Sequence, residues 1–246
     1  MNTLEQNQAL IAALLEKKNY NFDDLCCIVS VLRGEGGCPW DIEQTHKSIR
    51  TGMIEECYEV VEAIDKSDVA LLREELGDVL LQIVFHADIE KDAGNFNIDD
   101  VAHDECIKMI TRHPHVFSNI KADTSEQVLE NWEIIKSQEK QRVSLSDKLL
   151  SIPPMLPALM RASKVIKKTE YAMKMSEREL IDSLIIRLQN MQNGCPDQNA
   201  LGELLRDTVA LCRRYDVDAE EALSHTTDTM IEQVAKQEAD ANNSSV

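Results

Sequence analysis

The sequence is poor in residues that interrupt helices. Its 246 residues include only eight glycines and six prolines, and aromatic residues make up 4% of it. It also lacks an uncharged apolar run of about 18 residues, the least that spans a membrane as a helix. The stretch from Met1 to Glu5 shows no basic and then apolar signal-peptide pattern. We therefore expect a cytoplasmic protein with no membrane partner.

Paired cysteines are missing as well. The seven cysteines are odd in number and contain no CxxC pair. This argues against a disulfide framework and against a zinc site, because both leave recognisable cysteine spacings. We expect reduced thiols that fill space in the core.

Positive charge is scarce. Lysine and arginine number 26 against 44 acidic residues, which gives a net charge of −18. Such a chain repels nucleic-acid backbones and anionic membranes over a Debye length of roughly 8 Å. We expect no nucleic-acid partner, and a polyanionic substrate would need a cation to mediate its binding.

The hydrophobic residues that are present have helical spacing almost throughout. Apolar side chains recur at steps of three or four, as in Phe22, Leu25, Cys26, Val29 and Leu32. The pattern predicts an all-α fold. Two long helices, about residues 48–65 and about residues 69–91, are joined by a short segment with good N-cap chemistry, so the sequence predicts a helical hairpin.

A proline-rich segment, Ser151 to Pro157, is the predicted linker between two domains, residues 1–150 and 151–246.

Residues 201–208 can be aligned with residues 72–79, so the second half resembles a weakened copy of the first. The alternative is chance similarity between amphipathic helices. In this alignment Leu204 replaces Glu75 and Asp207 survives alone. We expect the second domain to lack the metal-binding motif and to support dimerisation or cover the first domain's pocket.

Four acidic residues occupy matching places on the two helices of the hairpin. Glu56 and Glu59 lie three apart, as do Glu75 and Asp78, so each pair projects from one helix face. In an antiparallel hairpin that turns near position 67, two residues lie at the same level when they are equally far from the turn in sequence. Glu59 and Glu75 meet this condition, and so do Glu56 and Asp78. The spacing therefore predicts four carboxylates at one level.

Four ionised acids on a partly buried seam repel one another unless a cation compensates them. Oxygen ligands alone suit Mg²⁺ or Mn²⁺, and two ions about 3.5–4 Å apart could share the cluster. The alternative is a solvated acidic face. Two features argue against a solvated face. The acids interrupt the edge of an apolar helix surface. Gly77 also lies mid-helix between Glu75 and Asp78, although glycine there costs about 1 kcal/mol of helix stability relative to alanine.

The same residues carry a family resemblance. Glu56-Cys57-Tyr58-Glu59 and Glu75-Leu76-Gly77-Asp78 resemble the ExxE and ExxD motifs of the MazG family of nucleoside triphosphate pyrophosphohydrolases. Four flanking segments strengthen the resemblance, which covers residues 25–170: Gly37 to His46, Phe85-His86, Arg112 to Phe117 and Asn131 to Lys136. It implies helical-bundle domains whose four-helix core is completed in a homodimer, Mg²⁺ dependence, and hydrolysis of (d)NTPs to monophosphate and pyrophosphate.

Such a reaction requires charge neutralisation and an aligned water. We expect Glu56, Glu59, Glu75 and Asp78 to be the metal ligands and the catalytic residues. Either Glu59 or Glu75 could accept the proton of the water, and the sequence does not choose between them.

Other residues are candidates for substrate binding. Lys108 and Arg112 lie four apart on one expected helix face, as do Lys136 and Lys140, and each pair could hold phosphates. The two tryptophans, Trp40 and Trp132, could stack on a base, and Gln44 could contact a base edge. The alternatives are surface cations that balance nearby acids and aromatic core anchors.

Three smaller expectations concern the histidines and their surroundings. Thr45 could cap the following helix, and His46 is expected to form local hydrogen bonds. His113 and His115 are not expected to bind metal, because no third nitrogen or sulfur ligand has compatible spacing.

The leading hypothesis is a Mg²⁺-dependent nucleoside triphosphate pyrophosphohydrolase that sanitises or balances nucleotide pools. The alternative is a sensing module that binds metal and nucleotide with little or no hydrolysis. The least favoured hypothesis is a di-iron carboxylate bundle. That fold requires two Glu-x-x-His pairs, and the only such spacing in the sequence runs from Glu43 to His46.

Overall fold

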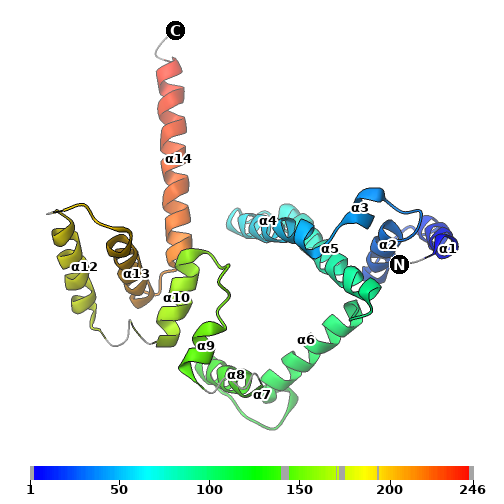
Figure 1. Cartoon of the computed structure of the whole chain (residues 1–246), viewed down its shortest axis with the longest axis horizontal. Coiled ribbons are helices and arrows are strands. Elements are labelled where there is room, and N and C mark those ends of the chain that lie inside the picture. Colours follow the sequence, from blue (N-terminus) through cyan, green and yellow to red (C-terminus); the bar gives the residue numbers. More distant parts are fainter. Residues whose placement is uncertain (1–2, 140–143, 170, 172–174, 193, 244–246) are drawn as a thin grey trace. The chain divides into compact units, whose positions relative to one another are not determined.

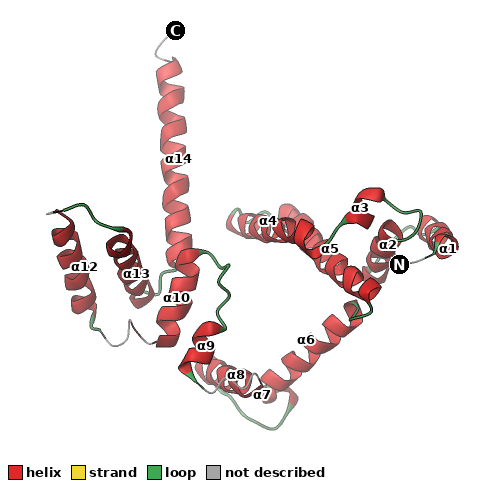
Figure 2. Ribbon diagram, viewed as in Figure 1, coloured by secondary structure: helices red, strands yellow, loops and turns green. Residues whose placement is uncertain are grey.

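A computed structural model describes residues 3–139, 144–169, 171, 175–192 and 194–243. These residues form helices and no strand, so the predicted all-α class is confirmed (Figure 2). The helices are α1 (Leu4–Leu15), α2 (Phe22–Arg33), α3 (Pro39–Glu43), α4 (His46–Asp65), α5 (Val69–Ala93), α6 (Ile98–Arg112), α7 (Pro114–Phe117), α8 (Ser125–Glu139), α9 (Leu145–Leu150), α10 (Ala158–Thr169), α12 (Glu177–Gln192), α13 (Gln198–Arg214) and α14 (Ala219–Asn243).

The predicted hairpin is formed by α4 and α5, which lie against each other (Figure 1). Thr45 caps α4, as expected, by accepting a hydrogen bond from the backbone N–H of Ser48. Asp68 caps α5 through the backbone N–H groups of Ala70 and Leu71. The turn between the helices places Ser67 at a φ of 53°, which reverses the chain within three residues.

The hairpin is packed against α2 by a small apolar core. Val29, Ile49, Val84 and Phe85 are buried there, and they come from α2, α4 and α5. These positions face one another because each helix carries its apolar residues at steps of three or four. The core lies toward the start of α4 and the later part of α5, so it fixes the two helices beyond the acidic motifs.

Arg33, at the end of α2, ties three segments together although it is only 3% exposed. Its Nε donates to Asp88 Oδ2 at 2.9 Å and its Nη2 to Asp92 Oδ2 at 3.0 Å, both on α5. Its Nη1 donates to the backbone carbonyl of Asp41 at 3.3 Å, and its guanidinium lies 5.2 Å from the centroid of the Phe85 ring. Because these partners satisfy a buried cation, they fix α3, and the loop of residues 34–38 that precedes it, relative to α5.

The chain divides into two compact units, residues 1–128 and residues 129–246. The division falls within α8, whereas the sequence places its domain boundary after residue 150; that boundary stays a prediction. The predicted linker from Ser151 to Pro157 contains no helix and separates α9 from α10.

The second unit has a core of its own. Ile166, Leu180, Val209 and Ala210 are buried together, and they come from α10, α12 and α13. Helix α14 follows α13 and contacts α10 and α13. No helix in the described parts of the chain has the length and apolar character that crossing a membrane requires.

Candidate metal and nucleotide site

Three acidic side chains of the hairpin converge. Glu56 of α4 and Glu75 and Asp78 of α5 each offer a carboxylate oxygen, and these oxygens lie within 4.8 Å of one another. Among the residues that the structure describes, this is the one group of three or more potential metal-ligating side chains. The arrangement follows from local geometry, because a spacing of three places two side chains on one face of a helix.

Glu59 lies beside this group on the more exposed side. Its side chain is exposed, whereas Glu56 and Asp78 are half-buried and Glu75 is 9% exposed. Glu59 nonetheless interacts with the carboxylates of both Glu56 and Glu75. The structure thus brings three of the four acids together and places the fourth next to them.

The electrostatics of the group disfavour four free carboxylates. Burial raises the pKa of Glu56 above its ordinary value, and the carboxylates of Glu59, Asp78 and Glu75 raise it further. Burial likewise raises the pKa of Glu75, followed by the effect of Glu59, Glu74 and Asp78. Glu56 and Glu75 are therefore held in surroundings that penalise their negative charge, and a bound cation would remove that penalty.

The donor set fits a hard divalent ion. All donors are carboxylate oxygens, which Mg²⁺ and Mn²⁺ prefer, and neither sulfur nor nitrogen is part of the group. Such an ion, when bound, supplies charge neutralisation for phosphates and lowers the pKa of a bound water. Glu56, Glu75 and Asp78 are the residues that would hold it.

Gly77 leaves the surface of α5 open between two of these acids. A Cβ atom at Gly77 would meet nothing within 4 Å in the described chain, so no packing contact accounts for this glycine. Gly52 differs, because a Cβ there would lie 3.1 Å from Nε2 of Gln82 on the facing helix. The glycine of α4 thus serves helix packing, whereas the glycine of α5 borders accessible space.

Helix α3 and its end hold two of the predicted substrate-binding residues. Trp40 is 65% exposed, so it is no core anchor within this chain. Gln44 Nε2 donates to the Trp40 carbonyl at 2.8 Å, and its Oε1 accepts from Ser48 Oγ at 2.8 Å. The Gln44 amide therefore joins α3 to the start of α4, and the role of both residues in base recognition stays a prediction.

Comparisons with known proteins match the segment that contains this acidic group. The profile of the MazG nucleotide pyrophosphohydrolase domain matches residues 44–117, which include both acidic motifs. The Bacillus subtilis protein YabN is 41% identical over 234 residues; the alignment covers 89% of this chain but 48% of YabN, so the chain spans about half the length of that relative.

A Thermotoga maritima protein, nucleoside triphosphate pyrophosphohydrolase/pyrophosphatase MazG, is 38% identical over 222 residues, 88% of this chain and 85% of that protein. The chain belongs to the MazG nucleotide pyrophosphohydrolase family. The Escherichia coli (strain K12) nucleoside triphosphate pyrophosphohydrolase is a further relative, 38% identical over 82% of this chain and 81% of its own length. The resemblance that the sequence motifs carry is thereby confirmed.

A network of hydrogen-bonded polar side chains, which the sequence analysis did not predict, fixes the MazG hairpin near its core. His46 Nε2 donates to Glu90 Oε1 at 2.6 Å, and Asn95 Nδ2 donates to Glu90 Oε2 at 2.6 Å. The Nδ1 atoms of His46 and His86 lie 2.7 Å apart, with the rings nearly parallel at 5.0 Å between centroids. Burial and then His46 lower the pKa of His86. His46 thus forms hydrogen bonds, as expected, but its partners lie 40 and 44 positions away on α5 and are not local. The motif Phe85-His86 was the signal for one of them.

The predicted phosphate-binding cations of α6 have partners inside the fold. Lys108 forms an ion pair with Glu105, three residues earlier on the same helix. Arg112 is 6% exposed and also interacts with other residues. The pairing of Lys108 is what a surface cation that balances an acid would show, so phosphate binding by these two residues stays a prediction.

Trp132 and Lys136 belong to α8 in the second unit. Trp132 is half-buried, and Lys136 Nζ lies 3.8 Å from Glu133 Oε1. Lys140, the predicted companion of Lys136, lies outside the described residues. Substrate binding by Trp132 and Lys136 stays a prediction.

The histidines at the start of α7 are not part of the acidic group. His113 donates through Nδ1 to the Met109 carbonyl at 2.6 Å. The rings of His113 and His115 are tilted by 56° with centroids 5.6 Å apart. Nδ1 of His115 is buried without a hydrogen-bond partner among the described atoms.

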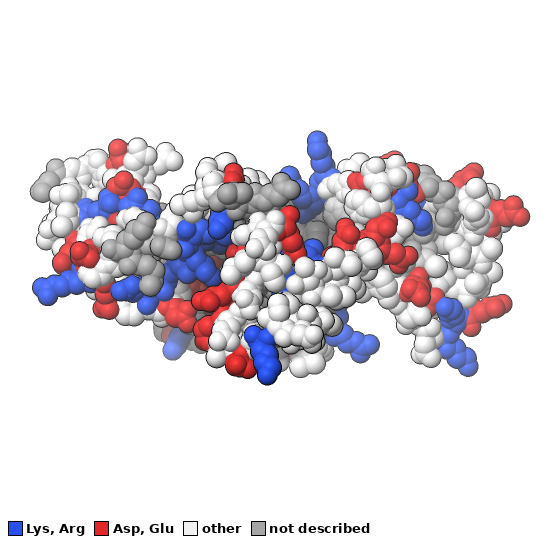
Figure 3. All heavy atoms as spheres, turned by 90° about the horizontal axis from the view of Figure 1, so that it is seen from below, with Lys and Arg blue, Asp and Glu red and all other residues white. Residues whose placement is uncertain are grey.

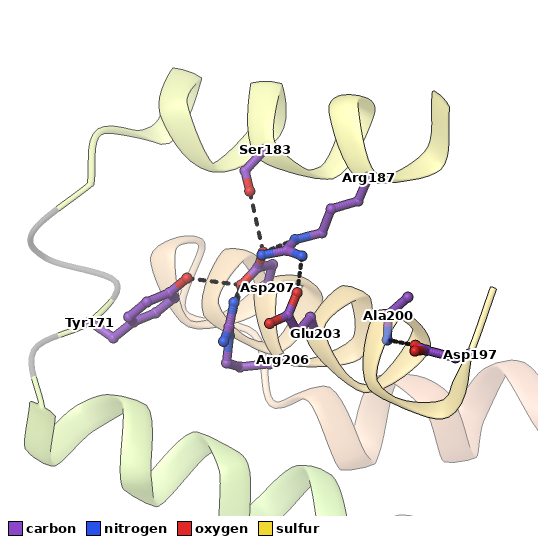
Figure 4. A network of polar contacts seen from close by, with 8 residues as sticks. All are labelled: Tyr171, Ser183, Arg187, Asp197, Ala200, Glu203, Arg206 and Asp207. Atoms are coloured by element: carbon purple, nitrogen blue, oxygen red, sulfur yellow. Dashed lines mark hydrogen bonds and ion pairs between the residues drawn. The ribbon is translucent and has the colours of Figure 1, made fainter. Parts of the chain in front are cut away.

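Asp207, the acid that the sequence alignment leaves alone in the second half, is fully buried and surrounded by donors (Figure 4). Arg187 Nε donates to its Oδ2 at 2.7 Å, and Arg206 Nε and Nη2 donate to its Oδ1 at 2.9 and 2.8 Å. Tyr171 and Ser183 complete the set through their hydroxyl groups at 3.0 and 3.3 Å. Two guanidinium groups thus compensate this carboxylate, which leaves it no free oxygen lone pairs to offer a metal.

Proposed function

We propose that the chain is a Mg²⁺-dependent nucleoside triphosphate pyrophosphohydrolase that cleaves (d)NTPs to the monophosphate and pyrophosphate. The convergence of Glu56, Glu75 and Asp78 is the observation that carries this proposal. Membership of the MazG family supports it, since the relatives from Thermotoga maritima and Escherichia coli are named nucleoside triphosphate pyrophosphohydrolases.

The carboxylates divide the work by their positions. Glu56, Glu75 and Asp78 hold the cation, because their oxygens lie within 4.8 Å of one another. Glu59 is the more exposed acid at the edge of this group and is not needed to complete it. It accepts the proton of the water that attacks the α-phosphorus, the bond between that phosphorus and the bridging oxygen breaks, and pyrophosphate leaves with the bridging oxygen.

Two substitutions separate these roles. Glu59→Gln is expected to keep Mg²⁺ binding and to lower kcat by about 10²-fold or more, since a general base contributes typically 10²–10⁴-fold. Glu75→Gln is expected to lower the affinity for Mg²⁺ as well. Glu55→Gln is the matched control, because Glu55 is an exposed neighbour on the same helix that is not part of the group.

The assay measures pyrophosphate release from a panel of (d)NTPs with Mg²⁺ or Mn²⁺, together with metal binding by calorimetry. Wild type and Glu55→Gln should release pyrophosphate at equal rates. Unchanged turnover in both Glu59→Gln and Glu75→Gln, with circular dichroism showing intact helices, would remove the assignment. Nucleotide binding without any product would instead indicate a sensing module.

We further propose that α4 and α5 form a four-helix core with a second copy of the chain. Large apolar side chains of these helices stay exposed: Ile54 (50%), Tyr58 (56%), Val61 (50%) and Leu76 (51%). Ile54, Tyr58 and Val61 follow one another at steps of four and three and form one stripe, which a monomer leaves in water. Sedimentation equilibrium tests this: Tyr58→Glu should shift a homodimer toward monomer, whereas a wild type that is monomeric at micromolar concentration contradicts it.

We place this activity in the cytoplasm, in the sanitation or balance of nucleotide pools. Fractionation of cells that express the chain with a tag at its C-terminus tests the location, and recovery in the membrane or an exported fraction would contradict it.

A further inference from the structure

Helix α10 is a basic element in an acidic chain. It carries Arg161, Lys164, Lys167 and Lys168 and no acidic residue, although the net charge of the whole chain is −18. Among the ion pairs of the described residues, only Lys168 of these four has one, at 4.0 Å from Glu133 Oε2. An exposed pair at that distance contributes little. Most of the positive charge of this helix is therefore not compensated by an ion pair of the described residues. On the face drawn in Figure 3, lysine and arginine side chains (blue) are interspersed with acidic side chains (red).

One side of α10 borders an open cavity of about 620 Å³, which we term the basic trough. Its wall is mostly apolar and includes Leu156, Ala162 and Val165, while Arg161 and Arg206 supply guanidinium groups and Tyr171 an aromatic ring. This volume lies within the range of about 300–1,000 Å³ that is typical of small-molecule sites. An apolar wall combined with cations fits a ligand that has one apolar and one anionic part.

The two arginines of the basic trough differ in how they are held. Arg206 is anchored by its two hydrogen bonds to Asp207, and its guanidinium lies 5.0 Å from the centroid of the Tyr171 ring. Asp207 neutralises much of its charge. Arg161 is exposed and has no carboxylate partner among the ion pairs of the described chain. The basic trough thus offers one uncompensated guanidinium and one preorganised, largely neutralised one.

We propose that the basic trough binds a nucleoside monophosphate, with the phosphate on Arg161 and the base against the apolar wall beside Tyr171. A single uncompensated arginine matches one phosphate group better than a triphosphate. The apolar wall and the aromatic ring give the base a surface to cover, which inorganic phosphate does not have. The choice of ligand rests on the proposed function, since a nucleoside monophosphate is its product, but the site shares no residue with the acidic group.

Calorimetry on the full chain with AMP or GMP in EDTA tests the proposal, because without metal the acidic group repels phosphates. Saturable binding is expected. Arg161→Gln should weaken it about tenfold or more, since a charge-assisted hydrogen bond is lost. Val165→Asp, which puts an anion on the apolar wall, should abolish it. Lys167→Gln is the matched control, because Lys167 lies on the same helix but does not line the cavity.

Further ligands and one further variant complete the design. Adenosine and inorganic phosphate should each bind at least tenfold more weakly than AMP. Absence of AMP and GMP binding at millimolar concentration, equal affinity in Arg161→Gln, or equal binding of inorganic phosphate overturns the proposal. Glu59→Gln should bind AMP like wild type, and pyrophosphate release by Arg161→Gln should be unchanged, so failure of the basic trough and failure of the hydrolase are distinguishable.

Discussion

Replacing Asp207 by alanine should destabilise the second unit by about 3 kcal/mol. Asp207 is 0% exposed and accepts hydrogen bonds from two arginines and two hydroxyl groups. Removing one partner of a buried ion pair costs about 3–5 kcal/mol, because the other charge stays behind uncompensated. The side chains of Arg187 and Arg206 are 26% and 38% exposed, so water can partly solvate them, which places the cost at the lower end of that range.

Hydrogen exchange followed by mass spectrometry measures this loss locally. A change of about 3 kcal/mol corresponds to roughly 100-fold faster exchange, since each 1.4 kcal/mol is a factor of ten. The acceleration should appear in peptides from α12 and α13 and leave α5 of the first unit unchanged. Arg187→Met combined with Asp207→Ala should cost less than the sum of the two single substitutions.

Asp182→Ala is the matched control. Asp182 is an exposed acid on α12, so its removal should change local stability by no more than about 0.5 kcal/mol. If Asp207→Ala exchanged no faster than Asp182→Ala, the buried network would contribute little to the stability of the unit. Compensation by two arginines would then be the wrong account of how this carboxylate remains buried.

Three further outcomes are expected. Gly77→Ala should raise the free energy of unfolding by about 1 kcal/mol, because a Cβ atom there meets nothing within 4 Å. Thermal unfolding measures this change. A loss of stability would show that a second copy or another chain packs against this glycine. Arg33→Met should cost about 3 kcal/mol in urea unfolding, because it leaves Asp88 and Asp92 without their buried cation, and Asp88→Asn should recover part of that loss in the double variant. Burial alone would raise the pKa of Asp207, but its hydrogen bonds to Arg206, Arg187 and Tyr171 outweigh that effect, so the pKa is lowered. The contribution of Asp207 to the stability of the second unit is therefore present above a pH of about 4 and is lost as the pH falls further. Exchange rates in α13 should show this loss in wild type but not in Asp207→Asn.

Most of the acidic site could be predicted from the sequence, because its geometry depends on residues that are close together in the chain. The spacing within Glu56-Cys57-Tyr58-Glu59 puts both acids on one helix face, and the turn near Ser67 sets the level at which α5 meets α4. Nothing in that argument requires knowledge of the remaining chain. The expected convergence is present for three of the four acids, and the fourth lies next to them.

Other features could not be read from spacing because they depend on which helices approach each other. Arg33 meets Asp88 across 55 positions, and His46 meets Glu90 across 44. A sequence contains many arginines and acids at such separations, and only packing selects the pairs. The same holds for the two acids that the sequence left as candidates for the general base: burial of Glu75 and exposure of Glu59 became visible only in the folded hairpin.

The sequence by itself determined the helical class, the hairpin, its turn and the face on which the acids stand, because helix periodicity and capping act over a few neighbouring residues. The tertiary structure decided which carboxylates are buried, which cations compensate Asp207 and where a basic helix borders an open cavity. These depend on the loss of water between distant segments, and solvent exclusion is a property of the packed chain that no local pattern contains.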